Sequence, residues 1–409
     1  MAIADVSNLQ LLGDGYEVAR SRFLDIAKRG GAKTISQAVP SKIADDLFID
    51  AAFYPARKKS EVFIVLISGQ HGVEAPAGSA IQRRLMDSVM AGGTLEVIDR
   101  DRSSVLMIHG MNPYGFKFSR RVNENNVDLN RNCFDAEQAK IQGFSGASIV
   151  NPNYDKVRSI LESDLESLAA VAKRIGSEQG WKSVFTFDGF ATIAKALTGQ
   201  YKHPRGIYYG GTQVEAECAI VQKIIADCFV GEKNSILLNF HTGLGKWATT
   251  QILTTPPDDL HGKFMPAYQR ELDCLYKIFS QKAQGGKDGV HQIRRGDQKP
   301  FFIRFFNPEN VMVQGELTQW MNSFFGDRRS EGIKLALTIE TGTYRGDKVL
   351  LSLVRENFQH WNLKDKDRKS KVTSDLCEMF NPRDPQWQAS VLRTAEFVGR
   401  ALVRFSREN

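Results

Sequence analysis

The chain has 409 residues, of which 42% are hydrophobic and 25% are charged, values that are ordinary for a globular protein. Its net charge of +7 is small for this length. The basic residues are spread out and form no RNA or DNA motif, which argues against a nucleic-acid partner. Five scattered cysteines without a C-x-x-C pair argue against a disulfide framework and a thiolate metal site.

The first 20 residues lack the basic start and apolar stretch of a signal peptide. No hydrophobic run approaches the length that crosses a bilayer. We therefore expect a soluble cytoplasmic protein without a membrane partner.

The first 110 residues alternate between helical and strand patterns. Residues 15–29 have apolar side chains at helical spacing and end at a glycine pair. The strand-like runs 47–54 and 62–67, joined by the turn PARKKS, predict a β-hairpin. A helix is expected over 75–90, and a strand over 103–109.

The remaining chain begins with a polar, Asn-rich loop, 119–132, that we expect to be held by its own side-chain hydrogen bonds. Residues 198–211 are expected to form a loop that faces the substrate or lies between domains. The pattern favours helices at 155–174, 189–197, 213–229, 268–284 and 386–405, strands at 235–240 and 334–340, and a charged linker at KDKDRKSK, 364–371.

Polar residues follow four of the apolar strands directly. They are His71 with Glu74, Asn112, His241 and Glu340. Ligands of open α/β sheets bind outside the carboxyl ends of the strands. The sequence therefore predicts an active site that is assembled from distant segments.

The pair His71 and Glu74 is weak by itself, because Glu74 in a surface turn could simply cap the helix that follows. His241 alone is more typical of a structural residue. Together they provide two imidazoles and one carboxylate, a three-ligand set that leaves a fourth position of one Zn²⁺ ion open for water. Mn²⁺ and Co²⁺ also fit these ligand types.

Glu340 ends an apolar strand, where an unpaired carboxylate is costly. It is either salt-bridged to an arginine or a general base with a raised pKa. In the polar loop, Arg121, Asn130 and Arg131 are either solvated or hold a substrate carboxylate and a developing oxyanion.

Five segments in this order resemble the zinc carboxypeptidase family and its relatives, the cytosolic carboxypeptidases and the aspartoacylase and succinylglutamate desuccinylase branch. They are HGVE, NPYGF, RRVNENNVDLNRN, NFHTG and LTIE. The likeness is strongest to the bacterial DUF2817 group of that superfamily. It spans roughly residues 60 to 345.

The resemblance implies roles for individual residues. His71, Glu74 and His241 would bind zinc, and Glu340 would be the general base. The family's oxyanion arginine would be Arg121, with Arg120 as the competitor. Asn130 and Arg131 would hold the substrate carboxylate, and the candidates for a tyrosine that closes on the substrate are Tyr344, Tyr208 and Tyr209.

We therefore expect an α/β fold with a mixed, mostly parallel twisted sheet flanked by helices. Residues 1–409 would form a single catalytic domain, with insertions near 143–206 and 246–333 and a C-terminal helical extension near 347–409. The expected function is zinc-dependent cleavage of an amide bond next to a substrate carboxylate, as in a metallocarboxypeptidase that acts on small peptides. The alternatives are an N-acyl amino-acid deacylase or desuccinylase, and a non-catalytic protein that binds a carboxylate ligand.

Overall fold

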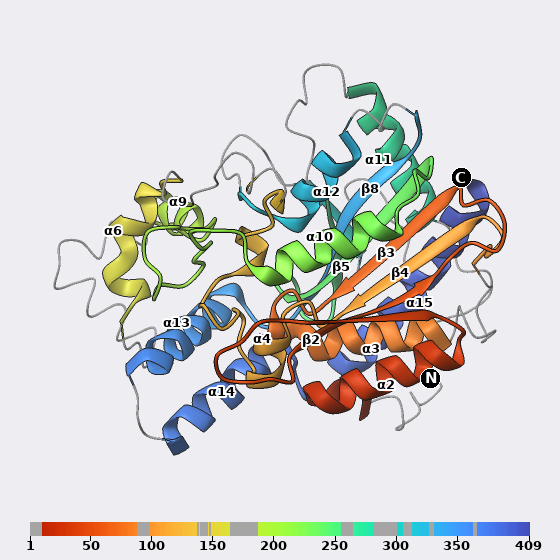
Figure 1. Cartoon of the computed structure of the whole chain (residues 1–409). Coiled ribbons are helices and arrows are strands. Elements are labelled where there is room, and N and C mark those ends of the chain that lie inside the picture. Colours follow the sequence, from red (N-terminus) through yellow and green to blue (C-terminus); the bar gives the residue numbers. More distant parts are fainter. Residues whose placement is uncertain are drawn as a thin grey trace.

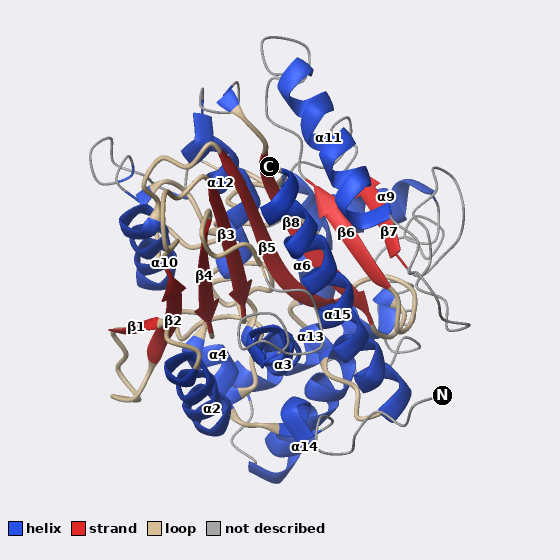
Figure 2. Ribbon diagram, turned by 90° about the vertical axis from the view of Figure 1, so that its right-hand side faces the viewer, coloured by secondary structure: helices blue, strands red, loops and turns tan. Residues whose placement is uncertain are grey.

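The strands of the computed structural model form one mixed sheet. The structure describes residues 10–87, 98–136, 149–163, 187–254, 265–280, 301–305, 313–326, 331–362 and 366–409, together with Ala139 and Gly146. The strands are β1 (Lys33–Ala38), β2 (Phe48–Tyr54), β3 (Val62–Ser68), β4 (Ser103–His109), β5 (Asn234–Gly243), β6 (Thr250–Thr254), β7 (Phe301–Phe305) and β8 (Lys334–Gly342). Their order across the sheet is β1-β2-β4-β3-β5-β8-β6-β7; Figure 1 labels β2, β4, β3, β5 and β8 of this series, and Figure 2 labels all of them.

Helices lie on both faces of this sheet (Figures 1 and 2). They are α2 (Tyr16–Arg29), α3 (Ala75–Leu85), α4 (Pro113–Phe118), α6 (Pro152–Leu161), α9 (Phe187–Ala196), α10 (Ala216–Cys228), α11 (Met265–Ser280), α12 (Leu317–Phe325), α13 (Gly346–Asn362), α14 (Lys366–Phe380) and α15 (Pro385–Glu408). Short 3₁₀ turns occur at η1 (Gln10–Gly13), η2 (Gly72–Glu74) and η4 (Leu129–Arg131). The described part of the chain has no helix that is long and apolar enough to span a membrane.

The central strands β4, β3, β5 and β8 are parallel and buried on both faces. Val62, Ile64 and Leu66 pack with residues of α3, α11 and α15. The alternating residues Phe63, Val65 and Ile67 pack with α10 and α12 on the other face. This two-sided burial explains the continuous apolar run of β3. The predicted mixed α/β sheet flanked by helices is confirmed.

The predicted hairpin between β2 and β3 is wrong, although both strands are present. β4 lies between them, and it pairs antiparallel with β2 and parallel with β3. All seven residues of β3 are buried, so the strand needs a hydrogen-bonded partner on each edge, and β4 and β5 supply them. β2 instead lies one position further out, where β1 pairs with its other edge.

The predicted charged linker at 364–371 is also wrong for the part that the structure describes, because residues 366–371 begin helix α14. Val372, Leu376 and Phe380 are buried and follow one another at four-residue spacing. This spacing places them on one face of a helix. Their burial stabilises helix α14. The charged composition of its first turns had predicted a solvent-exposed linker instead.

The other predicted helices are present with shifted ends. The one predicted over 155–174 is described only as α6, which ends at Leu161, and residues 164–186 lie outside the described residues. The helix predicted over 75–90 ends at Leu85 in α3, and residues 88–97 lie outside them too. Within residues 246–333, where the sequence predicted an insertion with one helix, β6 and β7 extend the sheet beyond β8.

The loop 119–132 is held by its own side chains, as predicted. The Asn123 side-chain oxygen accepts from the backbone N–H groups of residues 125 and 127, both at 3.0 Å. Asn126 donates to the carbonyls of Pro204 and Gly206, and Asn132 donates to two further carbonyls. The loop is thereby fixed against the segment 204–213.

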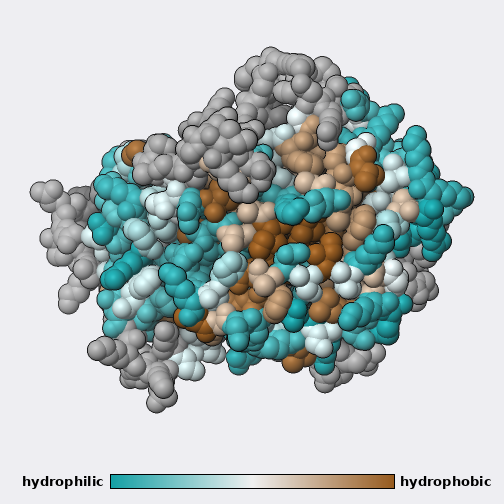
Figure 3. Space-filling view, in the orientation of Figure 1, coloured by the Kyte–Doolittle hydropathy of each residue, from teal (hydrophilic) through white to brown (hydrophobic). Residues whose placement is uncertain are grey.

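Hydrophobic side chains gather over the middle of the face that Figure 3 shows, with hydrophilic side chains around them.

His109, the last residue of β4, is a core histidine rather than a site residue. It is 1% exposed, and its ring stacks on Phe23 at 4.5 Å between centroids. Its Nε2 lies 2.8 Å from Ser79 Oγ. Burial, together with the charges of Arg83 and Arg20, lowers the pKa of His109 to about 3.

This low pKa predicts a pH-dependent loss of stability. Below the ordinary histidine pKa of about 6.5, His109 binds a proton in the unfolded chain but stays neutral in the folded protein. The free energy of unfolding therefore falls as the pH falls toward 3. Between pH 7.5 and pH 5.0 this group contributes a loss of about 2 kcal/mol. Urea unfolding at the two pH values should show this loss in the wild type and a correspondingly smaller one in His109→Gln. An equal loss in both proteins would contradict the assignment.

Candidate metal centre

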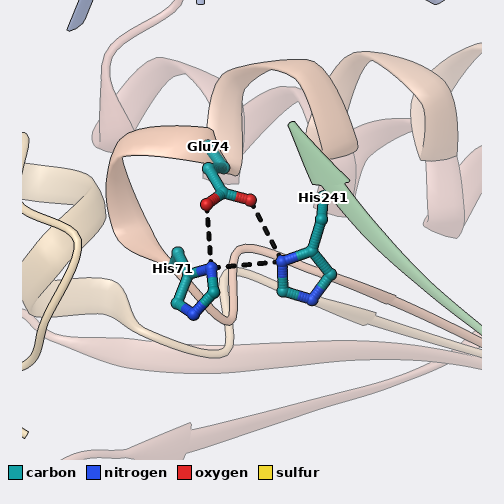
Figure 4. Close-up of side chains that lie close together, drawn as sticks. All are labelled: His71, Glu74 and His241. Atoms are coloured by element: carbon teal, nitrogen blue, oxygen red, sulfur yellow. Dashed lines mark hydrogen bonds and ion pairs between the residues drawn. The ribbon is translucent and has the colours of Figure 1, made fainter. Parts of the chain in front are cut away.

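Three predicted residues converge at the carboxyl ends of β3 and β5 (Figure 4). His71 Nδ1 lies 2.8 Å from Glu74 Oε1, and His241 Nδ1 lies 3.0 Å from Glu74 Oε2. The two Nδ1 atoms are 3.1 Å apart. All three side chains are buried, with at most 4% exposed.

The orientation of both imidazoles fits a cation. His71 Nε2 lies 3.0 Å from Asp128 Oδ1, and His241 Nε2 lies 3.2 Å from Gln70 Oε1. Since each of these oxygens accepts a hydrogen bond, we assign the ring proton to Nε2, which leaves a lone pair on each Nδ1. Two lone pairs and a carboxylate then face one point, and the donor separations are close to the value of about 3.3 Å for tetrahedral zinc ligands.

Glu74 is ionised in this arrangement. Burial opposes its charge, but imidazolium forms of His71 and His241, protonated on Nδ1 while no cation is bound, outweigh burial through their charge and hydrogen bonds and lower the Glu74 pKa. The backbone N–H of Thr242 also donates to Oε2 at 2.9 Å. An anionic carboxylate is the form that binds a metal.

Glu340 stands beside the cluster because of strand register. β5 and β8 are parallel neighbours in which His241 is opposite Glu340, so their side chains emerge on the same face of the sheet. Burial and the negative charge of Glu74 raise the pKa of Glu340 to about 8. The backbone N–H of Leu244 donates to its Oε1 at 2.8 Å. Among the described residues no arginine forms an ion pair with Glu340, so the alternative that an arginine neutralises this carboxylate is not supported.

Arg121 reaches the cluster, and its neighbour Arg120 does not. Arg121 Nε donates to Asp128 Oδ2 at 3.0 Å, and Nη1 donates to Glu74 Oε1 at 3.3 Å. Arg120 is buried in an ion pair with Glu356 at 2.7 Å. Of the two candidates, only Arg121 therefore lies where it can act on a group bound at the centre.

Asn112, the remaining polar residue of the four strand ends, is structural. Its side-chain oxygen accepts from the backbone N–H of Gly115 and caps α4. Its amide nitrogen donates to the carbonyl of Arg121 at 3.2 Å. Gly72 packs so closely on Gly115 that an added Cβ would lie 1.9 Å from its carbonyl carbon. These contacts fix the backbone that carries Arg121 against the turn at residues 71–74.

Arg131 and Asn130 lie further along the same loop. Arg131 is 7% exposed, and its Nη1 and Nη2 donate to the carbonyls of Asn130 and Leu197. The backbone N–H of Asn130 donates to Asp128 Oδ1 at 2.9 Å. The guanidinium groups of Arg131 and Arg121 both lie over the ring of Tyr208.

Sequence reasoning missed two residues that orient the histidines, Asp128 and Gln70. Outer carboxylate and amide partners fix the tautomer and the angle of a metal-binding imidazole. Asp128 begins the motif DLNRN and Gln70 immediately precedes His71. Their positions in or directly beside the recognised motifs could have drawn attention to both residues. Which side chains they contact is decided only by the fold.

The fold and this site define an α/β protein with a buried candidate metal centre. The chain belongs to the DUF2817 family, described as proteins of unknown function, whose model matches residues 13–394. The resemblance to this group that the motifs indicated is confirmed. Comparison with curated proteins gives no match.

Several solved structures share features with the chain at low identity. A protein from Shewanella denitrificans, described provisionally as a metallopeptidase, is 14% identical with a TM-score of 0.36 over 90% of each chain. A metallo-carboxypeptidase from Burkholderia cenocepacia is 12% identical with a TM-score of 0.42, over 88% of this chain and 66% of that chain. A succinylglutamate desuccinylase from a Silicibacter species is 10% identical with a TM-score of 0.37, over 80% and 64%. At these values the likenesses carry no conclusion about the reaction.

The centre predicts metal binding that depends on Asp128. Elemental analysis of protein purified without added metal should give about one zinc ion per chain for the wild type and almost none for His71→Ala. Asp128→Asn should weaken zinc affinity by about 10- to 100-fold, because the imidazole loses its charged partner. His109→Gln removes a histidine outside the centre and should keep the metal. Equal zinc content in the wild type and His71→Ala would contradict the assignment.

Proposed function

We propose that the protein is a metal-dependent hydrolase that cleaves an amide bond next to a substrate carboxylate, as a metallocarboxypeptidase does. The observation that carries this proposal is the position of Glu340 beside a three-donor centre that Arg121 also reaches. A non-catalytic binding protein needs no buried carboxylate with a raised pKa at this point. We further propose Zn²⁺ as the resident ion, since two imidazoles and one carboxylate are a catalytic zinc set.

A cation held by His71, Glu74 and His241 would polarise the scissile carbonyl and lower the pKa of water. Glu340 takes a proton from the attacking water molecule, whose oxygen adds to the carbonyl carbon. Protonated Glu340 then returns the proton to the amide nitrogen as the C–N bond breaks. Its raised pKa makes it a stronger base than an exposed glutamate.

The arginines bind and stabilise negative charge in this proposal. The guanidinium of Arg121 donates hydrogen bonds to the carbonyl oxygen as it becomes an oxyanion. Arg131, with Asn130, holds the substrate carboxylate and so fixes which amide bond lies at the centre. The hydrogen bonds within the loop support this proposal, because they fix the backbone that carries both arginines.

We also propose that the chain works as one catalytic domain. The support is the packing of its C-terminal helices. Residues of α15 belong to the same buried cluster as β3 and α3. α14 contributes Leu376 and Phe380 to the cluster around Val73, the residue before Glu74.

The proposal predicts that Glu340→Gln abolishes turnover without removing the metal. Loss of a general base lowers kcat by about 10²- to 10⁴-fold. The assay is amino-acid release from a panel of short peptides and N-acyl amino acids, with zinc content measured on the same preparations. Glu396→Gln makes the same change at an exposed position of α15 and should leave the rate unaltered.

Full activity of Glu340→Gln would contradict the role of Glu340. Release from N-acyl amino acids alone would identify a deacylase in place of a carboxypeptidase. Tight binding of these compounds to the zinc-loaded wild type without turnover would support the non-catalytic alternative.

A further inference from the structure

The ring of Tyr208 contacts two guanidinium groups. The Cζ atom of Arg121 is 5.1 Å from the ring centroid, and that of Arg131 is 5.5 Å away. A guanidinium within about 6 Å of an aromatic face is attracted by the ring quadrupole. One ring therefore contacts both arginines of the proposed mechanism, although the two belong to different parts of the loop.

The backbone holds Tyr208 in an unusual conformation. Its φ of 55° lies in the left-handed region, which a bulky residue rarely adopts. The N–H of Gln200 donates to the Tyr208 carbonyl at 3.0 Å, and the N–H of Asp128 donates to the Tyr209 carbonyl at 2.7 Å. Such strained residues persist where surrounding contacts enforce them, and they concentrate at functional sites.

The ring is also fixed from the metal side. Tyr208 packs against the cluster that contains Val73, Val349 and Leu353, and Val73 directly precedes Glu74. Burial raises the pKa of Tyr208, so its hydroxyl stays neutral. The guanidinium groups therefore meet a neutral aromatic ring.

Arg131 has an unused donor in this position. Among the described residues its Nε is buried without a hydrogen-bond partner, while its Nη1 and Nη2 donate to backbone carbonyls. Buried donors nearly always have a partner. A bound anion would supply the acceptor that this N–H lacks.

We propose that Tyr208 is a positioning residue whose ring holds Arg121 and Arg131 as a paired site for a carboxylate-bearing substrate. This inference rests on the proposed function, but it concerns the arrangement of the arginines and needs no turnover to be tested. The aromatic ring carries the effect, and the hydroxyl is dispensable.

Two substitutions separate the ring from the backbone. Tyr208→Phe keeps the ring. Tyr208→Gly removes it, and glycine adopts a positive φ without strain, so the loop keeps its conformation. Tyr276→Leu is a matched control, because it replaces a tyrosine of α11, outside the site.

The readout is labelling of individual arginines in the full chain by phenylglyoxal, followed by peptide mass spectrometry. Loss of the ring should speed labelling of Arg121 and Arg131 about tenfold in Tyr208→Gly. Tyr208→Phe and Tyr276→Leu should label as the wild type does. Arg345, whose side chain is 81% exposed, is the internal standard and should label equally in all four proteins.

Labelling of Arg121 and Arg131 at the wild-type rate in Tyr208→Gly would overturn the proposal. Labelling of these arginines in Tyr208→Phe as fast as in Tyr208→Gly would overturn it too. Succinate, used as the carboxylate probe, should protect both arginines in the wild type and lose about tenfold in affinity in Tyr208→Gly. Absence of protection in the wild type would overturn the carboxylate part. Failure of the proposed function would appear separately, as missing zinc or missing hydrolysis with the labelling pattern intact.

Discussion

The parallel register of β3, β5 and β8 is the constraint on which the site depends. It places Ser68 opposite Phe240, and His241 opposite Glu340. Because side chains alternate between faces, a slip of one residue would turn His241 away from Glu74 and separate it from Glu340. Backbone hydrogen bonds between these strands thus set where His241 and Glu340 lie. Burial of the strands on both faces opposes a change of register.

A single carboxylate, Asp128, links His71 of the candidate metal centre to Arg121. One oxygen contacts His71 and the other accepts from Arg121. Burial opposes its ionisation, but Arg121 and His71 outweigh burial and lower the pKa of Asp128. Burial lowers the pKa of Arg121, but the negative charges of Asp128 and Glu74 outweigh burial and raise it, so the guanidinium stays protonated. A substitution of His71 or of Arg121 therefore changes the environment of the other through Asp128. The proposed roles of these two residues are not independent.

The sequence predicted those parts of the site that residue type and chain position define. His71, Glu74, His241 and Glu340 carry recognisable chemistry directly after apolar strands, and the structure brings them together. Asp128 and Tyr208 were not assigned these contacts, because their partners lie in segments that only the tertiary structure makes adjacent.

The fold was predictable to a similar extent and for the same physical reason. Buried strands such as β3 and β4 are evident from continuous apolar runs. The hairpin prediction failed because strand order depends on which edges need partners. The linker prediction failed because the buried apolar residues of α14 start only at Val372, after the charged segment.

Glu74 and His241 are 167 residues apart in the chain, and this separation has a consequence for folding. The turn at residues 71–74 supplies two of the three donors. The third, His241, joins them only when β5 pairs with β3. Contacts between such distant residues form late and slowly. A cation that needs all three donors binds the folded chain far better than the unfolded one, so it adds to stability by mass action. If such a cation binds here, its free concentration would set the folded fraction of the chain as well as the occupancy of the proposed site.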